Sequence, residues 1–279
     1  MTLPTFFIPH GAGPCFFMDW TRGPADTWDK TAAWLKGLVA GLPARPKAIL
    51  VVSGHWEEPV FTVGSSAKPP MIFDYYGFPE ETYRLRFDAP GSPALARRVR
   101  ELLGAAGFPT AEDAARGYDH GVFVPLLLAT PDADIPVVQL SLRADLDPQA
   151  HLAAGRALAP LRDEGVLIMG TGNIVHNLGV MTWNAQKGPA YDWADRFMGE
   201  MREAIQADQP QRVIDFAKMG QAAQLSAPTP EHFWPLLYVL GARLPGDRAR
   251  LVNDFIEYGS LGMTTVVLED GADAARNAA

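Results

Sequence analysis

Residues 167–179, LIMGTGNIVHNLG, decide how the rest of the sequence is interpreted. The segment opens with an unbroken apolar run, which is typical of a strand buried on both faces of a sheet. The run leads into a glycine-rich turn, with Gly170 and Gly172, and a histidine, His176, follows. A lone histidine after a strand is most often a capping or hydrogen-bonded residue. Whether His176 has a chemical role therefore depends on where the other five histidines lie.

Similar apolar runs, bounded by Gly, Pro or Ser, recur along the chain and predict buried strands. They cover residues 5–9, 48–53, 135–142, 166–170 and 264–269. Amphipathic patterns between them predict helices, two of which begin with an N-cap residue followed by proline. These helical patterns cover residues 26–42, 91–107, 147–161 and 191–206. Strands that alternate with helices predict an α/β fold with a mostly parallel central sheet, covered by helices on both faces.

The chain shows no internal repeat and no linker-like stretch, so we expect one domain over residues 1–270 and a frayed tail over residues 271–279. The net charge of −8 argues against a nucleic-acid or anionic-membrane surface. The single cysteine fits a reducing compartment, and neither a signal peptide nor a transmembrane segment is recognisable. We expect a soluble, cytoplasmic protein that is a monomer or a small homo-oligomer.

The histidines gather at the ends of predicted elements. Three of them follow predicted strands: His10, His55 and His176. Because the carboxyl ends of parallel strands share one edge of a sheet, these imidazoles can converge although they are distant in sequence. His120 and His232 lie where a loop enters a helix, whereas His151 lies inside a predicted helix and is expected at the surface.

This histidine pattern indicates a catalytic metal site. Neutral imidazole is the commonest protein ligand for metals, and three such ligands leave open positions for a substrate. With one cysteine, a thiolate-rich site is excluded. A Cys15–His10 nucleophile is a weaker alternative, because a single buried cysteine is usually inert. The chain has no HExxH helix, no G-x-S-x-G elbow and no dinucleotide-binding glycine pattern.

Two loops are unusual in composition. Residues 68–87 combine Pro, Gly and aromatic side chains, and the alternation at residues 83–87 is typical of a strand. Residues 117–129 lead into an apolar helix. Both loops fit either a satellite core or the walls of a pocket. Three arginines, Arg84, Arg86 and Arg143, are candidates to pair with a substrate carboxylate.

Seven segments, taken together and in order, resemble one enzyme family. They are PHGAGP at 9–14, VVSGHWE at 51–57, YYGFPEETY at 75–83, YDHGVFVPL at 118–126, IPVVQLSL at 135–142, GTGNIVHNL at 170–178 and PTPEHFWPLLYVLGA at 228–242. The sequence resembles the class III extradiol ring-cleavage dioxygenases, in particular the single-chain branch typified by DOPA 4,5-extradiol dioxygenase. That branch is similar in fold to the catalytic subunit of protocatechuate 4,5-dioxygenase.

The resemblance implies a role for each matching residue. His10, His55 and His232 are expected to bind the metal, and His176 and His120 to be catalytic. His176 would act as an acid/base that lies close enough to touch the metal in some arrangements. His120, with Asn177 and Tyr118, is expected to contact the substrate.

The third metal ligand has an alternative. The protocatechuate subunit uses a carboxylate there, and this chain carries Glu231 next to His232. Neighbouring residues on a helix point about 100° apart, so only one of the two is expected to bind.

The resemblance implies a metal-dependent dioxygenase that opens a catechol ring with O2. Fe(II) fits because oxygen chemistry needs a redox-active metal with vacant positions, although Zn(II) can occupy such a site in purified protein. Two rival hypotheses remain: a zinc hydrolase that uses the same histidines to activate water, and a binding protein that has this fold but no activity.

Overall fold

The structure is a computed structural model that describes residues 2–183 and 189–272. Within these residues, one sheet of eight strands runs in the order β4-β3-β5-β2-β6-β1-β10-β7. Its strands are β1 (Thr5–Ile8), β2 (Ala48–Glu58), β3 (Phe61–Gly64), β4 (Thr110–Asp113), β5 (Val137–Arg143), β6 (Val166–Thr171), β7 (Asp247–Val252) and β10 (Thr265–Asp270). The pairs β4–β3, β5–β2, β2–β6 and β6–β1 are parallel, whereas β3–β5, β1–β10 and β10–β7 are antiparallel.

The central strands are buried on both faces because apolar side chains alternate between two cores. In β2, Leu50 belongs to the core on one face, whereas Ile49 and Val51 belong to the core on the other. In β6, Ile168 and Leu167 are divided in the same way. This continuous burial explains why these strands read as unbroken apolar runs.

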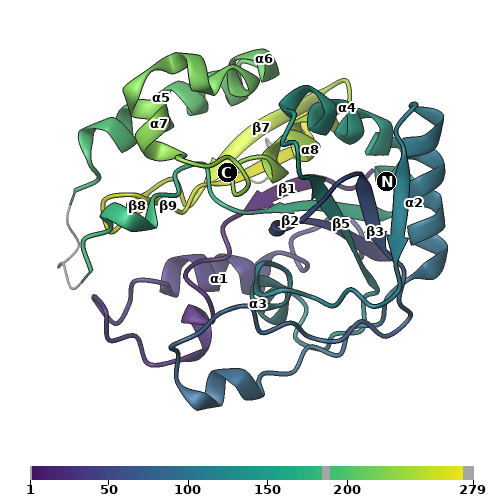
Figure 1. The fold of residues 1–279 in the computed structure, drawn as a ribbon, viewed down its shortest axis with the longest axis horizontal. Coiled ribbons are helices and arrows are strands. Elements are labelled where there is room, and N and C mark those ends of the chain that lie inside the picture. Colours follow the sequence, from purple (N-terminus) through teal and green to yellow (C-terminus); the bar gives the residue numbers. More distant parts are fainter. Residues whose placement is uncertain (1, 184–188, 273–279) are drawn as a thin grey trace.

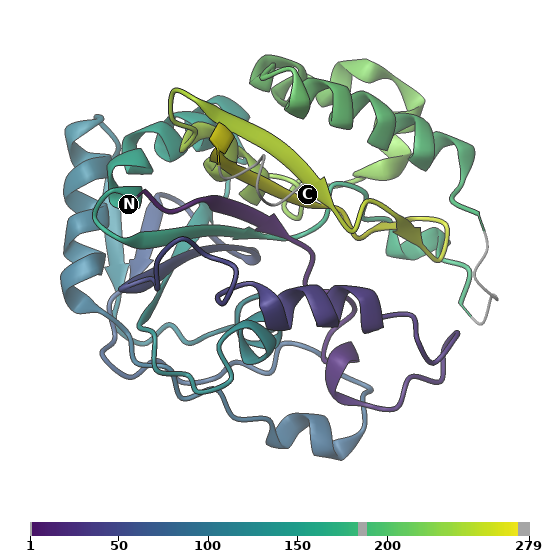
Figure 2. The same ribbon diagram turned by 180° about the vertical axis from the view of Figure 1, so that it is seen from behind.

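Helices cover both faces of the sheet (Figures 1 and 2). The α-helices are α1 (Asp29–Gly37), α2 (Pro93–Ala105), α3 (His120–Ala129), α4 (Pro148–Leu158), α5 (Asp192–Gln206), α6 (Pro210–Ile214), α7 (Gln221–Ser226) and α8 (Pro235–Gly241). Helices α1 and α3 pack on one face, and α2, α4, α5 and α8 contribute to the core on the other. The predicted α/β class, with a mostly parallel sheet between helical layers, is confirmed.

The five apolar runs predicted as strands all form strands, namely β1, β2, β5, β6 and β10, but several other strands were not predicted. The overlooked strands β3, β4 and β7 are short or partly exposed, and β4 has no apolar run at all. A small hairpin of β8 (Ile256–Glu257) and β9 (Leu261–Gly262) was also missed. The strand suggested at residues 83–87 is wrong, since a 3-10 helix over Glu80–Arg84 occupies its beginning.

The expectation that His151 lies at the surface is also wrong. Its side chain is fully buried in α4. Its Nδ1 atom lies 2.6 Å from the carbonyl oxygen of Asp147, and its Nε2 atom accepts a hydrogen bond of 3.1 Å from the backbone N–H of Arg143. His151 therefore connects the first turn of α4 to the end of β5, which is a structural role.

The C-terminal tail and the absence of a membrane span were also predicted from the sequence. Of the predicted tail, residues 273–279 lie outside the described residues, and β10 carries the sheet as far as Asp270. None of the helices that the structure describes is long and apolar enough to cross a bilayer.

Candidate metal centre

His10 enters the site from the carboxyl end of β1. The strand ends at Ile8, and the backbone then turns through Gly11 and Gly13, whose φ angles are +76° and +56°. Glycine adopts such positive φ values without strain. A Cβ atom at Gly11 would also lie 2.5 Å from the Sγ atom of Cys15. The turn thus needs glycine, and it leaves His10 buried at the edge of the sheet.

His55 lies within β2, where the pairing with β5 shifts register between Val52 and Glu57. The strand extends to Glu58, beyond the predicted residues 48–53, and His55 lies where its pairing is irregular. The hydroxyl of Ser53 accepts a hydrogen bond of 3.2 Å from the backbone N–H of His55 and donates one of 2.8 Å to Asp119. A bulge of this kind redirects a side chain out of the regular pleat.

His232 lies in the turn that precedes α8, and the glycine-rich turn after β6 supports it. The backbone N–H of Asn173 donates a hydrogen bond of 2.8 Å to the carbonyl oxygen of His232. A Cβ atom at Gly172 would lie only 2.1 Å from that same oxygen, and one at Gly54 would lie 2.9 Å from the carbonyl oxygen of Glu231. These glycines therefore allow the segment that carries His232 to approach β2 and β6 closely.

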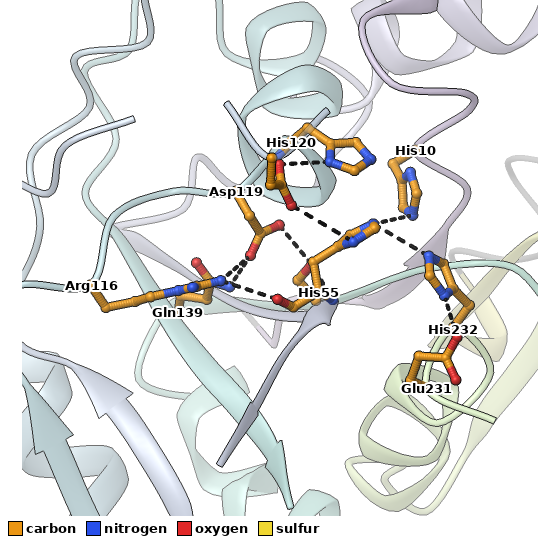
Figure 3. Close-up of polar contacts among 10 residues, drawn as sticks. His10, His55, Arg116, Asp119, His120, Gln139, Glu231 and His232 are labelled. Atoms are coloured by element: carbon orange, nitrogen blue, oxygen red, sulfur yellow. Dashed lines mark hydrogen bonds and ion pairs between the residues drawn. The ribbon is translucent and has the colours of Figure 1, made fainter. Parts of the chain in front are cut away.

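The Nε2 atoms of His10 and His232 both approach the Nε2 atom of His55 (Figure 3). The Nε2 atom of His55 lies 3.3 Å from that of His10 and 3.3 Å from that of His232. Nitrogens bound to one ion at about 2.0–2.1 Å lie roughly 2.9–3.4 Å apart in tetrahedral or octahedral arrangements. Both distances from His55 are therefore those expected between ligands of a single metal ion.

The hydrogen bonds of His232 strengthen the fit to a cation. Its Nδ1 atom lies 3.1 Å from the Oε1 atom of Glu231, and a carboxylate only accepts, so Nδ1 carries the proton. The Nε2 atom of the neutral ring is then a bare lone pair facing His55. A proton on the Nε2 atom of His55 could form a hydrogen bond to only one of its two neighbours. A metal ion could instead be bound by the Nε2 atoms of all three rings.

Burial keeps these rings neutral. It lowers the pKa of His10 and His232 well below the usual value, and the neighbouring histidines lower it further. Burial also lowers the pKa of His55 to about 4. Neutral imidazole is the form that binds metals. The donor set therefore fits a divalent metal ion at neutral pH.

Glu231 contacts the ring of His232 instead of joining the three converging nitrogens. Hydrogen bonds from ligand imidazoles to carboxylates commonly fix the orientation and tautomer of the ring. Glu231, His232 and His176 nevertheless form a second set of possible metal ligands, whose ligand atoms lie within 4.8 Å of one another. Glu231 and His176 thus lie at the border of the site.

His176 stacks on His232. The two rings are nearly parallel, at 11°, and their centroids are 3.7 Å apart. The backbone N–H of His176 donates a 2.7 Å hydrogen bond to the carbonyl oxygen of Ser226. Burial lowers the pKa of His176 to about 4. The structure therefore brings His176 against a candidate ligand as a half-buried, neutral ring.

His120 is the first residue of α3 and faces the same centre. Its ligand nitrogen groups with those of His10 and His55 within 4.8 Å. Its Nδ1 atom and its backbone N–H lie 2.8 Å and 2.9 Å from the Oδ1 atom of Asp74. Burial alone would raise the pKa of Asp74, but the hydrogen bonds from His120 outweigh it and lower the pKa to about 2.

The two other residues expected to contact the substrate bond to the main chain. The hydroxyl of Tyr118 is buried and donates to the carbonyl oxygen of Val137 at 2.9 Å. The amide of Asn177 donates to the carbonyl oxygen of Leu225 at 2.8 Å. Both side chains stabilise the loops that carry the neighbouring histidines, so we do not include them in the proposed substrate contacts.

A buried polar network beneath His55 was not predicted from the sequence. Asp119 is fully buried and accepts hydrogen bonds from Ser53, from Arg116 at 2.8 Å and from Gln139. Arg116 also donates to the carbonyl oxygen of His55 at 3.3 Å (Figure 3). The available signal was an acidic residue directly before His120, whereas the partners Ser53 and Gln139 lie on β2 and β5 and form no local pattern with it.

Other sequence candidates lie in less reactive surroundings. Burial raises the pKa of the Cys15 thiol, which argues against a thiolate nucleophile. Arg84 pairs with Glu80, and Arg143 pairs with Asp145, so both already have acidic partners. Arg86 is exposed.

The fold and the site define a class of protein: an α/β enzyme with a candidate histidine metal centre at the carboxyl edge of its parallel strands. Residues 4–269 match the family model described as the catalytic LigB subunit of aromatic ring-opening dioxygenase. The chain belongs to this family. The predicted class, an extradiol ring-cleaving dioxygenase, is thereby confirmed.

Individual proteins of known sequence or structure are similar to most of this chain. It is 39% identical over 269 residues to 4,5-DOPA dioxygenase extradiol from Escherichia coli, covering 95% of this chain and 94% of that protein. It is 40% identical over 261 residues to 4,5-DOPA dioxygenase extradiol from Portulaca grandiflora, covering 92% and 93%. The crystal structure of an uncharacterized protein from Escherichia coli K12 superposes with a TM-score of 0.78 at 34% identity, covering 96% of this chain and all of that one.

Proposed function

We propose that this protein is an Fe(II)-dependent dioxygenase that opens a catechol ring with O2 beside its hydroxyl groups. The observation that carries the proposal is the approach of the Nε2 atoms of His10 and His232 to the Nε2 atom of His55, at 3.3 Å each. Three neutral protein ligands would hold the ion and leave it open to a substrate, as in catalytic metal sites generally.

The metal would be held by His10, His55 and His232. A bound redox-active divalent ion supplies Lewis acidity toward the catechol hydroxyls and an electronic route to O2. The chain contributes surroundings with little water, because His10 and His232 are almost fully buried. Glu231 fixes the ring of His232 through its Nδ1 atom.

Two further histidines would handle protons. His120 carries its Nδ1 proton toward Asp74, so its Nε2 atom is free to accept a proton from a catechol hydroxyl. His176 is neutral and stacked on His232, where it can accept a second proton and return it as the ring opens. A ligand nitrogen of His120 lies within 4.8 Å of those of His10 and His55, and a ligand nitrogen of His176 lies within 4.8 Å of ligand atoms of Glu231 and His232.

The substrate class can be narrowed from the relatives. Two of them are named as acting on DOPA, a catechol that carries an amino-acid side chain. We therefore propose a catechol with a polar side chain as the first substrate to test. The cytoplasmic location, the monomeric or small oligomeric state and the occasional presence of Zn(II) remain predictions from the sequence.

A comparison of metals separates this proposal from the zinc-hydrolase alternative. Metal-free protein would be reconstituted without oxygen with Fe(II) or with Zn(II), and each form assayed against DOPA, simple catechols and an activated ester. We expect ring opening only with Fe(II) and O2, and no metal-dependent ester hydrolysis. Ester hydrolysis by the Zn(II) form, with no oxygen uptake by the Fe(II) form, would favour the hydrolase.

A further inference from the structure

The segment that carries Asp74 is fastened alongside the segment that leads to His120. The backbone N–H of Ile72 donates to the carbonyl oxygen of Tyr118 at 2.8 Å, and that of Tyr118 donates to the carbonyl oxygen of Pro70 at 2.8 Å. A Cβ atom at Gly117 would lie 2.1 Å from the same Pro70 oxygen, so glycine is required for this approach. Two short backbone contacts thus hold residues 70–72 next to the start of α3.

This docking brings one carboxylate between two imidazoles. The Oδ1 atom of Asp74 accepts hydrogen bonds from both the backbone N–H and the Nδ1 atom of His120. Its Oδ2 atom lies 3.7 Å from the Nδ1 atom of His55. The next residue, Tyr75, places its ring 5.9 Å from the His120 ring and donates its hydroxyl to the carbonyl oxygen of Thr82 at 2.7 Å. The His120 ring is therefore held on two sides by the same loop.

We infer that Asp74 is a positioning residue that selects the Nδ1–H tautomer of His120 and aims the bare Nε2 atom at the substrate. The inference rests on the proposed function, in which the Nε2 atom accepts a catechol proton. In that step the O–H bond of the substrate breaks and an N–H bond forms at Nε2. The electron pair of the O–H bond stays on the catechol oxygen, and the resulting imidazolium keeps its Nδ1–H bond to Asp74.

The geometry distinguishes this role from simple helix capping. A carboxylate that only capped α3 would need the backbone N–H of His120, whereas Asp74 also bonds the ring nitrogen. Neutral imidazole has one donor and one acceptor nitrogen, so occupation of Nδ1 by an acceptor determines the chemistry of Nε2. Without Asp74 the ring is free to turn and to carry its proton on either nitrogen.

The first test reads the tautomer directly and needs no turnover. Metal-free protein with 15N-labelled histidine would be compared by nitrogen–proton correlation spectra for wild type, Asp74→Ala and the control Asp88→Ala, with His120→Ala identifying the signals. Asp88 is an exposed acidic residue nearby in the chain. We expect Nδ1–H signals for His120 in wild type and in the control, and a shift toward Nε2–H in Asp74→Ala. An Nε2–H signal in wild type, or no shift in Asp74→Ala, would overturn the inference.

The second test asks whether Asp74 acts through His120. Turnover of Fe(II)-saturated Asp74→Ala, His120→Ala and the double variant would be compared, with thermal melting as a check on folding. We expect Asp74→Ala to lower kcat by about 10- to 100-fold with little change in KM. The double variant should have the same kcat as His120→Ala alone. Additive losses would contradict a role through His120. Asp74→Leu, which keeps a side chain of similar length without an acceptor oxygen, replaces Asp74→Ala if that variant does not fold.

The two tests separate this inference from the proposed function. The tautomer of His120 is observable whether or not the protein opens a catechol ring. Absence of ring opening in wild type would contradict the proposed function, whereas an unaltered tautomer in Asp74→Ala would contradict only the role of Asp74.

Discussion

The Nε2 atom of His55 lies 3.3 Å from the Nε2 atom of His232, although 177 residues separate them in the chain. His55 belongs to the irregular part of β2, and His232 belongs to the turn before α8. Their contact depends on glycines at positions 54 and 172, where a side chain would collide with the backbone of the segment that carries His232. The candidate metal centre thus depends on close backbone packing as well as on its histidines.

Substitutions at Glu231 and His232 should differ in their effect on metal binding. His232→Ala removes one of three converging nitrogens, so we expect loss of tight binding. Glu231→Gln keeps the ligand and alters only its hydrogen bond, so affinity should fall by about 10- to 100-fold. Titration of metal-free protein with Fe(II) or Co(II) measures both. Equal losses in the two variants would instead favour Glu231 as a direct ligand.

Gly172→Ala should disturb the site without removing a functional group. The added Cβ atom would lie 2.1 Å from the carbonyl oxygen of His232, which is backbone and has little room to move. We expect the free energy of unfolding to fall by about 1–3 kcal/mol, as in other overpacked sites, together with weaker metal binding.

Gly104→Ala is the matched control for that substitution. Gly104 lies in α2, is exposed and has no atom within 4 Å of the added Cβ position. Alanine should raise stability there by up to about 1 kcal/mol, because it favours helix more than glycine does. Denaturant unfolding of both variants gives the comparison, and an unchanged stability in Gly172→Ala would contradict the proposed packing.

His176→Phe should separate catalysis from metal binding. Phenylalanine preserves a ring that can stack on His232, but it has no nitrogen to exchange protons. We expect kcat to fall by about 100- to 10,000-fold while the metal content stays close to that of wild type. Metal analysis beside steady-state kinetics checks this, and loss of the metal would mean that His176 is itself a ligand.

The stability of the metal-free protein should decrease as the pH falls from about 6.5 toward 4, and His151 should account for part of the change. Burial lowers the pKa of His151 from 6.5 to about 4. Between these values the unfolded chain binds a proton at this position and the folded chain does not, so acid favours unfolding. The stabilisation is present above pH 6.5, and at lower pH up to about 3 kcal/mol of it is lost.

His151→Gln provides the measurement for that effect. Glutamine cannot titrate, yet its carbonyl oxygen can accept the hydrogen bond from the backbone N–H of Arg143. Urea unfolding at several pH values should give a slope that is smaller by up to about 1.4 kcal/mol per pH unit in this variant. Identical slopes in the two proteins would show that His151 titrates normally.

The fold was predictable where burial leaves a simple pattern. Strands such as β2 and β6 are apolar on both faces, so their sequences are continuous apolar runs. Strands β4 and β7 lie at the two ends of the sheet, with half-exposed side chains and few apolar residues, and were missed. The buried position of His151 depends on how α4 lies against β5, which periodicity along one helix does not reveal.

The site was predictable at the level of its histidines but not of their partners. A parallel sheet brings the residues after its strands to one edge, so His10 and His55 were expected to converge. Asp74, by contrast, reaches His120 only because backbone hydrogen bonds dock residues 70–72 beside Tyr118. Contacts of this kind between two loops depend on tertiary packing, so no local sequence pattern predicts them.

Oxygen consumption by the Fe(II)-reconstituted protein tests the central claim most directly. Uptake of O2 would be followed with DOPA and related catechols, together with the absorbance and mass of the product, for wild type and for His10→Ala. The account predicts one O2 consumed per ring-opened product, with both oxygen atoms in that product, and no reaction in the variant. Tight Fe(II) binding without oxygen uptake for any catechol would contradict it.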